Sequence, residues 1–144
     1  MIPADREDEA RIENHRKDRE GWGFITVEQP RDIERARHQM SGHATVLLDS
    51  LTALLANEMF CPDYRENALE KVNEGLVNLS ESVENIVVVS DTIYSDAAHY
   101  DAMTENYRKS LALAERALAV RFDCVAEVSC AGVCYHKGDK IEIC

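Results

Sequence analysis

Apolar residues in this chain form short continuous runs, separated by longer stretches in which they recur every three or four positions. The clearest run, at residues 86–89, has four adjacent β-branched residues and predicts a strand buried on both faces, as in a parallel sheet. Similar runs predict further strands at residues 24–27, 44–48 and 125–129, with a final short pairing at about 135–143.

Helical spacing or helical composition fills the stretches between these runs. It predicts helices at about residues 4–19, 31–40, 51–60, 64–79 and 101–121. Strands that alternate with helices indicate an α/β layered fold with right-handed crossovers. We expect one domain over residues 1–144, because 45% hydrophobic residues suffice for a core of ordinary size.

Charge and cysteine content exclude several classes of protein. The net charge of −11 disfavours binding to nucleic acids and anionic membranes. No apolar run approaches the roughly 20 residues of a membrane helix, and the polar start is unlike a signal peptide. Five cysteines, an odd number, favour a reducing compartment. We therefore expect a soluble, cytoplasmic protein with no nucleic-acid partner and no membrane span.

One histidine lies among charged residues of the first predicted helix. A neutral imidazole is a workable nucleophile near pH 7, and the cations beside His15 would neutralise an approaching polyphosphate. The alternative is a solvated side chain on a polar helix.

Acidic residues follow two of the predicted strands. Asp49 has the layout of a Walker B carboxylate, which holds Mg²⁺ beside a nucleotide, or it caps the helix that follows. Asp91 has the same two interpretations. A further alternative is a metal site built from the C-terminal soft ligands, Cys130, Cys134, His136 and Cys144.

Several segments together carry a family resemblance. Residues 11–19 read RIENHRKDR and are followed by Trp22 and by TVEQP at 26–30. Residues 45–58 read TVLLDSLTALLANE, an apolar strand, an acidic residue and a helix. The strand ending VVVSD at 87–91, the helix at 107–121 and EVSCAG at 127–132 continue the likeness. In these segments the chain resembles the adenosylcobinamide kinase / adenosylcobinamide-phosphate guanylyltransferase family.

This resemblance implies a P-loop NTPase-like (RecA-like) fold, with a mainly parallel sheet flanked by helices. It implies phosphorylation of adenosylcobinamide and GMP transfer from GTP to adenosylcobinamide phosphate, in cobalamin biosynthesis. The substrate nucleotide would be GTP or ATP, with Mg²⁺. The catalytic residue would be His15, which forms a covalent guanylyl-histidine. The nucleotide site would be lined by Arg16, Lys17, Asp18 and Arg19, with Glu28 and Asp49 contacting the guanosine part or the metal. A homotrimer is expected.

The chain departs from the family pattern in two places. It contains no G-x-x-x-x-G-K-[ST] phosphate loop, so we expect a family member truncated at its N-terminus. Residues 91–100, DTIYSDAAHY, replace the family's usual NEVGxGIVPE loop. Without the phosphate loop the β- and γ-phosphates would be unheld, so whether this chain is an enzyme stays open. The alternative is an inactive truncated paralogue that acts as a binding or assembly module. Because strands are missing, a strand such as residues 87–89 would expose an edge, and we expect the protein to be prone to association.

Overall fold

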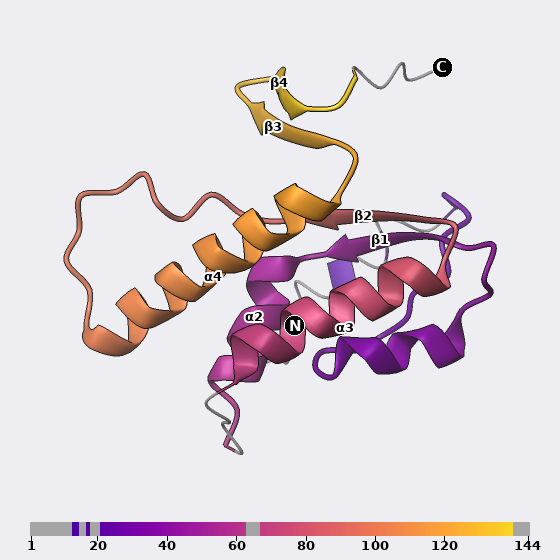
Figure 1. The fold of residues 1–144 in the computed structure, drawn as a ribbon, viewed down its shortest axis with the longest axis horizontal. Helices are drawn as coiled ribbons and strands as arrows, with labels where there is room; N and C mark the ends of the chain where they lie inside the picture. Colours follow the sequence, from indigo (N-terminus) through magenta and orange to yellow (C-terminus); the bar gives the residue numbers. More distant parts are fainter. Residues whose placement is uncertain (1–12, 15–16, 18–20, 63–66, 140–144) are drawn as a thin grey trace.

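The computed structural model describes residues 13–14, 17, 21–62 and 67–139 (Figure 1). Along the chain the elements are a 3₁₀-helix η1 (Ile33–Gln39), strand β1 (Thr45–Asp49), helices α2 (Leu51–Met59) and α3 (Ala68–Ser82), strand β2 (Asn85–Val89), helix α4 (Ala102–Arg121), and strands β3 (Val125–Ser129) and β4 (Gly132–Lys137).

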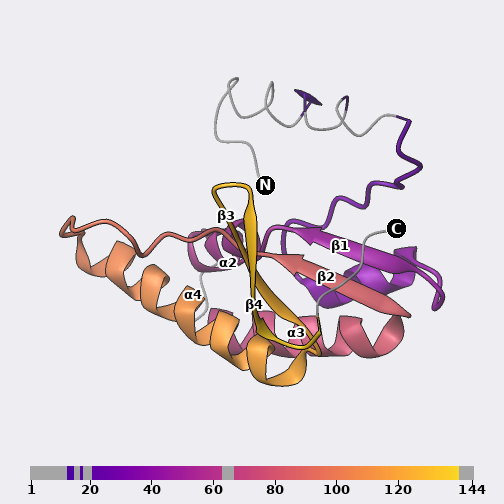
Figure 2. The ribbon, with the colours of Figure 1, turned by 90° about the horizontal axis from the view of Figure 1, so that it is seen from above.

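The central unit is a pair of parallel strands joined by helices. β1 and β2 run in register from Thr45 opposite Asn85 to Asp49 opposite Val89. The connection between them contains α2 and α3, so these segments form the β-α-β arrangement that alternating runs predict. In Figures 1 and 2, α3 and η1 lie on one side of the strand pair. The predicted α/β class is confirmed for this part of the chain.

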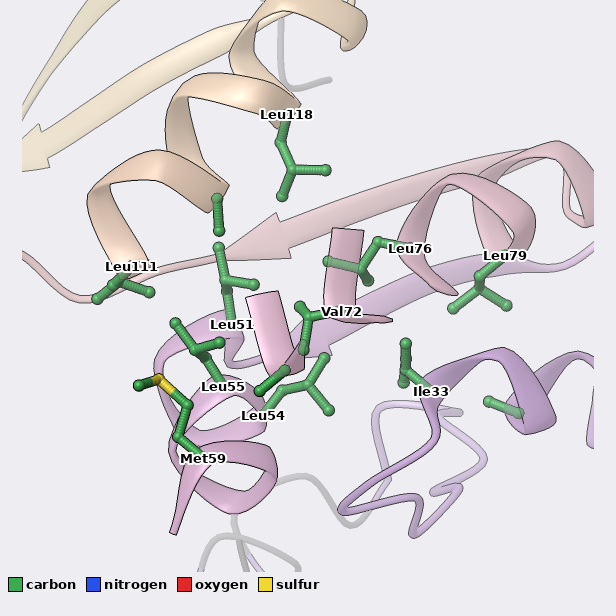
Figure 3. Close-up of a cluster of buried hydrophobic side chains, with 13 residues drawn as sticks. Ile33, Leu51, Leu54, Leu55, Met59, Val72, Leu76, Leu79, Leu111 and Leu118 are labelled. Atoms are coloured by element: carbon green, nitrogen blue, oxygen red, sulfur yellow. The ribbon is translucent and has the colours of Figure 1, made fainter. Parts of the chain in front are cut away.

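The hydrophobic core lies between that face of the sheet and the helices. Leu51 and Leu55 of α2, Leu76 of α3 and Leu111 of α4 are at most 1% exposed and converge at its centre (Figure 3). Gly75 lets η1 approach α3, because a Cβ atom there would lie 2.8 Å from Cγ2 of Ile33. α3 therefore buries one stripe of side chains, which recurs about every 3.6 residues along the helix, against the core.

The opposite face of β1 and β2 is open, which corrects the prediction of burial on both faces. Leu47, Val87 and Val89 are 45%, 52% and 40% exposed. Ile86 and Val88 point to the core side and pack against it. The reason is that no element among the described residues covers the other face of the strand pair (Figure 2).

Two N-terminal predictions are also corrected. Residues 24–27 form no strand and pair with no strand in the described part of the chain, and Phe24 and Ile25 are 53% and 91% exposed. The helix predicted at 31–40 is the 3₁₀-helix η1, entered through Asp32 in the left-handed conformation at φ 51°. Apolar side chains at 24–27 have no facing strand to pack against, so strand propensity alone does not produce a ladder.

Other predicted helices keep their place with shifted ends. α3 spans Ala68–Ser82 rather than 64–79, and residues 63–66 lie outside the described residues. α4 begins after its N-cap Asp101, whose side chain accepts hydrogen bonds from the backbone of Met103 and Thr104. The helices predicted at 51–60 and 101–121 are therefore confirmed within one residue at each end.

The last two strands form a separate hairpin. β3 pairs antiparallel with β4, which begins at Gly132, earlier than the predicted pairing at 135–143, and ends at Lys137. Lys137 Nζ donates to the carbonyl oxygens of Ala119 and Val120 at 3.0 and 2.9 Å, which ties the hairpin to the C-terminal end of α4. Within the described residues the strands thus form one parallel and one antiparallel pair, a smaller parallel sheet than expected.

Candidate functional site

The carboxyl ends of β1 and β2 meet at one edge of the sheet. Asp49 is the last residue of β1 and pairs in register with Val89, the last residue of β2, so Ser90 and Asp91 emerge beside it. Ligands of open parallel sheets collect at this edge. The structure therefore brings together the two acidic residues that the sequence singles out.

Asp49 does not cap α2. The N-cap is Ser50, whose Oγ accepts a hydrogen bond from the backbone N–H of Ala53 at 3.2 Å. The helix-cap interpretation of Asp49 is therefore wrong. Asp49 is exposed, and its carboxylate makes no hydrogen bond or ion pair with another described residue. An exposed carboxylate at a strand end fits a Mg²⁺-bearing ligand, because hard cations prefer oxygen ligands.

Asp91 is positioned by α2 and α4. Its backbone N–H donates to Oγ1 of Thr52 at 2.9 Å, and the hydroxyl of Tyr107 donates to the carbonyl oxygen of Thr52 at 2.9 Å. Asp91 caps no described helix, because α4 is capped by Asp101, so its cap interpretation is wrong as well. Burial, followed by the negative charges of Asp91 and Glu115, raises the pKa of Tyr107 to about 12. Tyr107 is therefore a neutral donor at physiological pH.

Glu115 of α4 binds the segment after β2 through hydrogen bonds. It accepts hydrogen bonds from the hydroxyls of Ser90 at 2.6 Å and Tyr94 at 3.0 Å. Burial, and then the bond to Glu115, raise the pKa of Tyr94 well above its ordinary value. Side-chain contacts thus hold the chain between β2 and α4. Figure 1 shows this loop extending away from the sheet to the N-terminal end of α4, and the helix then leads back toward the sheet.

The sequence did not single out Thr52, Tyr107 or Glu115 for this edge. Tyr107 and Glu115 stand eight positions apart on one helix, which is compatible with a shared face. Nothing in the local pattern, however, says which loop residue that face would meet.

Most of the predicted nucleotide-binding cluster lies outside the described residues. These residues are His15, Arg16, Asp18 and Arg19. Lys17 is described and is helical, exposed and 3.8 Å from the carboxylate of Glu13 one turn away. Glu28 is exposed in the segment before η1. The roles assigned to these side chains stay predictions.

The C-terminal cysteines do not assemble a metal site in the part of the chain that is described. Cys130 lies in the hairpin turn, whereas Cys134 lies on β4 opposite Glu127. The ring of His136 contacts the carboxylate of Glu127 at 3.1 Å. Among the described residues, no group of three His, Cys, Asp or Glu side chains is arranged to hold an ion, and Cys144 lies outside them.

Comparison with known families identifies the family of this chain. A family model described as cobinamide kinase / cobinamide phosphate guanyltransferase matches residues 1–135. The chain belongs to this family. A search of curated proteins found no significant match.

Membership of the cobinamide kinase / cobinamide phosphate guanyltransferase family confirms the resemblance seen in the sequence. It supports a part in cobalamin biosynthesis and kinase or transferase chemistry on cobinamide and guanine nucleotides. None of the helices within the described residues combines the length and apolarity needed to cross a bilayer. The exposed carboxylate of Asp49 lies at the carboxyl edge of the strand pair, where ligands of open parallel sheets collect.

Proposed function

We propose that this chain carries out the guanylyl-transfer half of the family reaction, moving GMP from GTP to adenosylcobinamide phosphate in the cytoplasm. The observation that carries the proposal is the family match over residues 1–135, which includes His15 and its neighbouring cations. The sequence contains no G-x-x-x-x-G-K-[ST] loop, so we assign the kinase half no residues in this chain.

The proposed chemistry has two balanced steps. An imidazole nitrogen of His15 attacks the α-phosphorus of GTP, a P–N bond forms, and the bond to the bridging oxygen breaks as pyrophosphate leaves. A phosphate oxygen of adenosylcobinamide phosphate then attacks the same phosphorus, the P–N bond breaks, and the free imidazole returns.

The surrounding residues would supply charge rather than covalent bonds. Arg16, Lys17 and Arg19 would neutralise the triphosphate, and Glu28 would contact the guanosine part. Asp49 would hold Mg²⁺, directly or through water, which would stabilise the departing pyrophosphate. The expected homotrimer stays a prediction.

Intact-protein mass after incubation with GTP and Mg²⁺ tests the proposal. We expect a gain of one GMP that is lost in mild acid, because a phosphoramidate is acid-labile. His15→Ala should abolish the gain, whereas His38→Ala, a matched change at an exposed histidine of η1, should leave it intact. Asp49→Asn should slow it. Absence of any gain in the wild-type protein would overturn the proposal and favour a binding or assembly module.

A further inference from the structure

A second polar feature lies just beyond Asp91. A hollow of about 360 Å³ opens between the loop that follows β2 and the first half of α4. Thr92, Ser95 and Asp96 line it from the loop, and Tyr100 and Arg108 line it from the end of the loop and from α4. This volume is at the lower end of the range for small-molecule sites, roughly 300–1,000 Å³. The hollow thus suits a small ligand or one arm of a larger one.

Arg108 is the positively charged residue among those that line the hollow. Its side chain is only 15% exposed, and its Nη atoms contact the carboxylates of Glu105 at 3.0 Å and Asp96 at 3.4 Å. Its guanidinium carbon lies 5.1 Å from the centre of the Tyr100 ring. A guanidinium has five N–H donors, two of them on each Nη atom, and each Nη atom makes one hydrogen bond to a described residue, to Glu105 or to Asp96. Arg108 therefore keeps donor capacity for a ligand.

Charge decides what kind of acceptor suits this donor. The positive charge of Arg108 is already shared by Asp96 and Glu105, so these three side chains sum to one negative charge. A phosphate or carboxylate entering here would meet uncompensated carboxylates. An uncharged acceptor such as an amide carbonyl accepts from the guanidinium without that repulsion.

The loop side of the hollow offers the complementary groups. The hydroxyls of Thr92 and Ser95 make no hydrogen bond to another described residue. A hydroxyl both donates and accepts, as does a carboxamide through its carbonyl and its NH₂ group. Tyr100, 43% exposed, adds an aromatic surface. A primary carboxamide next to an apolar body uses all of these groups at once.

We infer that this hollow binds a neutral carboxamide arm of the acceptor substrate. The inference rests on the proposed function, because the family acts on cobinamide, a corrinoid whose side arms are uncharged amides. Asp91 lies between the hollow and the carboxyl edge of the sheet, so an acceptor held here is adjacent to the strand ends. The variant loop at 91–100 then serves as a specificity element rather than as a nucleotide contact.

Binding of dicyanocobinamide, followed by calorimetry, tests this assignment. Arg108→Lys should weaken binding by about tenfold or more, because an ammonium lacks the guanidinium's fixed fork of donors. Thr92→Val and Ser95→Ala should each weaken it by about threefold to tenfold, and neither hydroxyl supports the fold through a described contact. Arg116→Lys, on α4 but outside the lining, is the matched control and should bind as the wild type does.

Three results would overturn the assignment. The first is wild-type affinity in all three lining variants, and the second is no cobinamide binding by the wild type. The third is competition by inorganic phosphate that depends on Arg108, which would show that the hollow is an anion site. Far-UV circular dichroism of Arg108→Lys checks that the helix is retained.

Failure of this inference is distinguishable from failure of the proposed function. GMP labelling of His15 needs no acceptor, so the lining variants should still be labelled by GTP. If the lining variants are labelled by GTP and bind cobinamide with wild-type affinity, the proposed function stands and the inference is overturned. Protein that GTP does not label, but that binds cobinamide in an Arg108-dependent manner, would overturn the proposed function and leave the inference standing.

Discussion

Lys71 of α3 donates to Oε2 of Glu58 of α2 at 2.6 Å, and Glu58 is only 5% exposed. The same ammonium lies 2.7 Å from Asp32, whose backbone N–H donates to Glu58 at 2.7 Å. One buried carboxylate therefore joins three segments of the chain: α2, α3 and the entry to η1.

Replacing Lys71 with Met should leave the Glu58 carboxylate buried without its cation. Removing one partner of a fully buried pair costs about 3–5 kcal/mol. The Lys71 side chain is 32% exposed and admits water, so we expect a smaller loss of about 2–3 kcal/mol in the free energy of unfolding. Urea denaturation measures it, and Lys109→Met, at an exposed position of α4, should change stability by less than about 0.5 kcal/mol. Equal losses in the two variants would contradict the prediction.

The same cluster should make stability depend on pH. The hydrogen bond from Lys71 holds the pKa of Asp32 below its ordinary value of 3.8. Burial lowers the pKa of Lys71, but its hydrogen bonds to Asp32 and Glu58 outweigh this and leave it above 10.5. The Asp32 contribution is therefore present above pH 3.8 and lost as pH falls through the folded-state pKa, and the Lys71 contribution is lost as pH rises through its own.

Asp32→Asn isolates the loss of stability at acidic pH that comes from Asp32, because Asn also tolerates the left-handed backbone at this position. The stability difference between wild type and variant should stay constant at neutral pH and shrink toward zero as pH falls from 3.8 through the lower folded-state pKa of Asp32. Denaturant titrations at several pH values measure it. A difference that stayed constant down to strongly acidic pH would show that the Asp32 charge contributes nothing.

The two residues of the turn between β3 and β4 are unfavourable for the left-handed backbone that they adopt. Cys130 and Ala131 have φ values of 49° and 63°, and a two-residue hairpin turn of this kind favours Asn-Gly. Replacing the pair by Asn-Gly should stabilise the hairpin by about 1–2 kcal/mol, seen as slower amide exchange in both strands.

Gly138→Ala supplies the opposite change as a control for the hairpin. Its φ is 80°, and an added Cβ would lie 2.5 Å from the carbonyl oxygen of Asp123, so exchange in the hairpin should become faster. If the Asn-Gly variant also exchanged faster than the wild type, backbone strain at the turn would not limit hairpin stability.

The elements that the sequence predicted well are those fixed by local pattern. β1, α2, β2 and α4 follow from continuous apolar runs or helical spacing, which report side-chain periodicity directly. The run at 86–89 misled in one respect, because β-branched residues show what a strand is able to bury and not which elements are present to cover it.

The candidate site was predictable only in outline. Placing Asp49 at a strand end needed only the order of elements, whereas assigning the cap of α2 to Ser50 needed the backbone geometry at that turn. The contact between Ser90 and Glu115 joins residues 25 positions apart through an irregular loop, and no periodicity encodes such a path. The predicted nucleophile, His15, lies outside the described residues.

The open face of β1 and β2 should make the protein associate as its concentration rises. Leu47 and Val87 are register partners, both about half exposed, and with Val89 they form an apolar strip on the open face of the strand pair. Val87→Lys places a charge in the middle of this strip and should reduce association, with little loss of stability because the position is exposed. Sedimentation velocity over a range of concentrations measures the effect.

Val120→Lys is the matched control for association, because Val120 is 79% exposed on α4 and lies outside the strip. We expect it to associate like the wild type, since charge added elsewhere leaves the strip intact. Lysine at either position adds one positive charge to the net charge of −11, so a difference between the two variants reports the strip and not overall repulsion. Monomeric sedimentation of the wild type at all concentrations would show that the open face does not drive self-association.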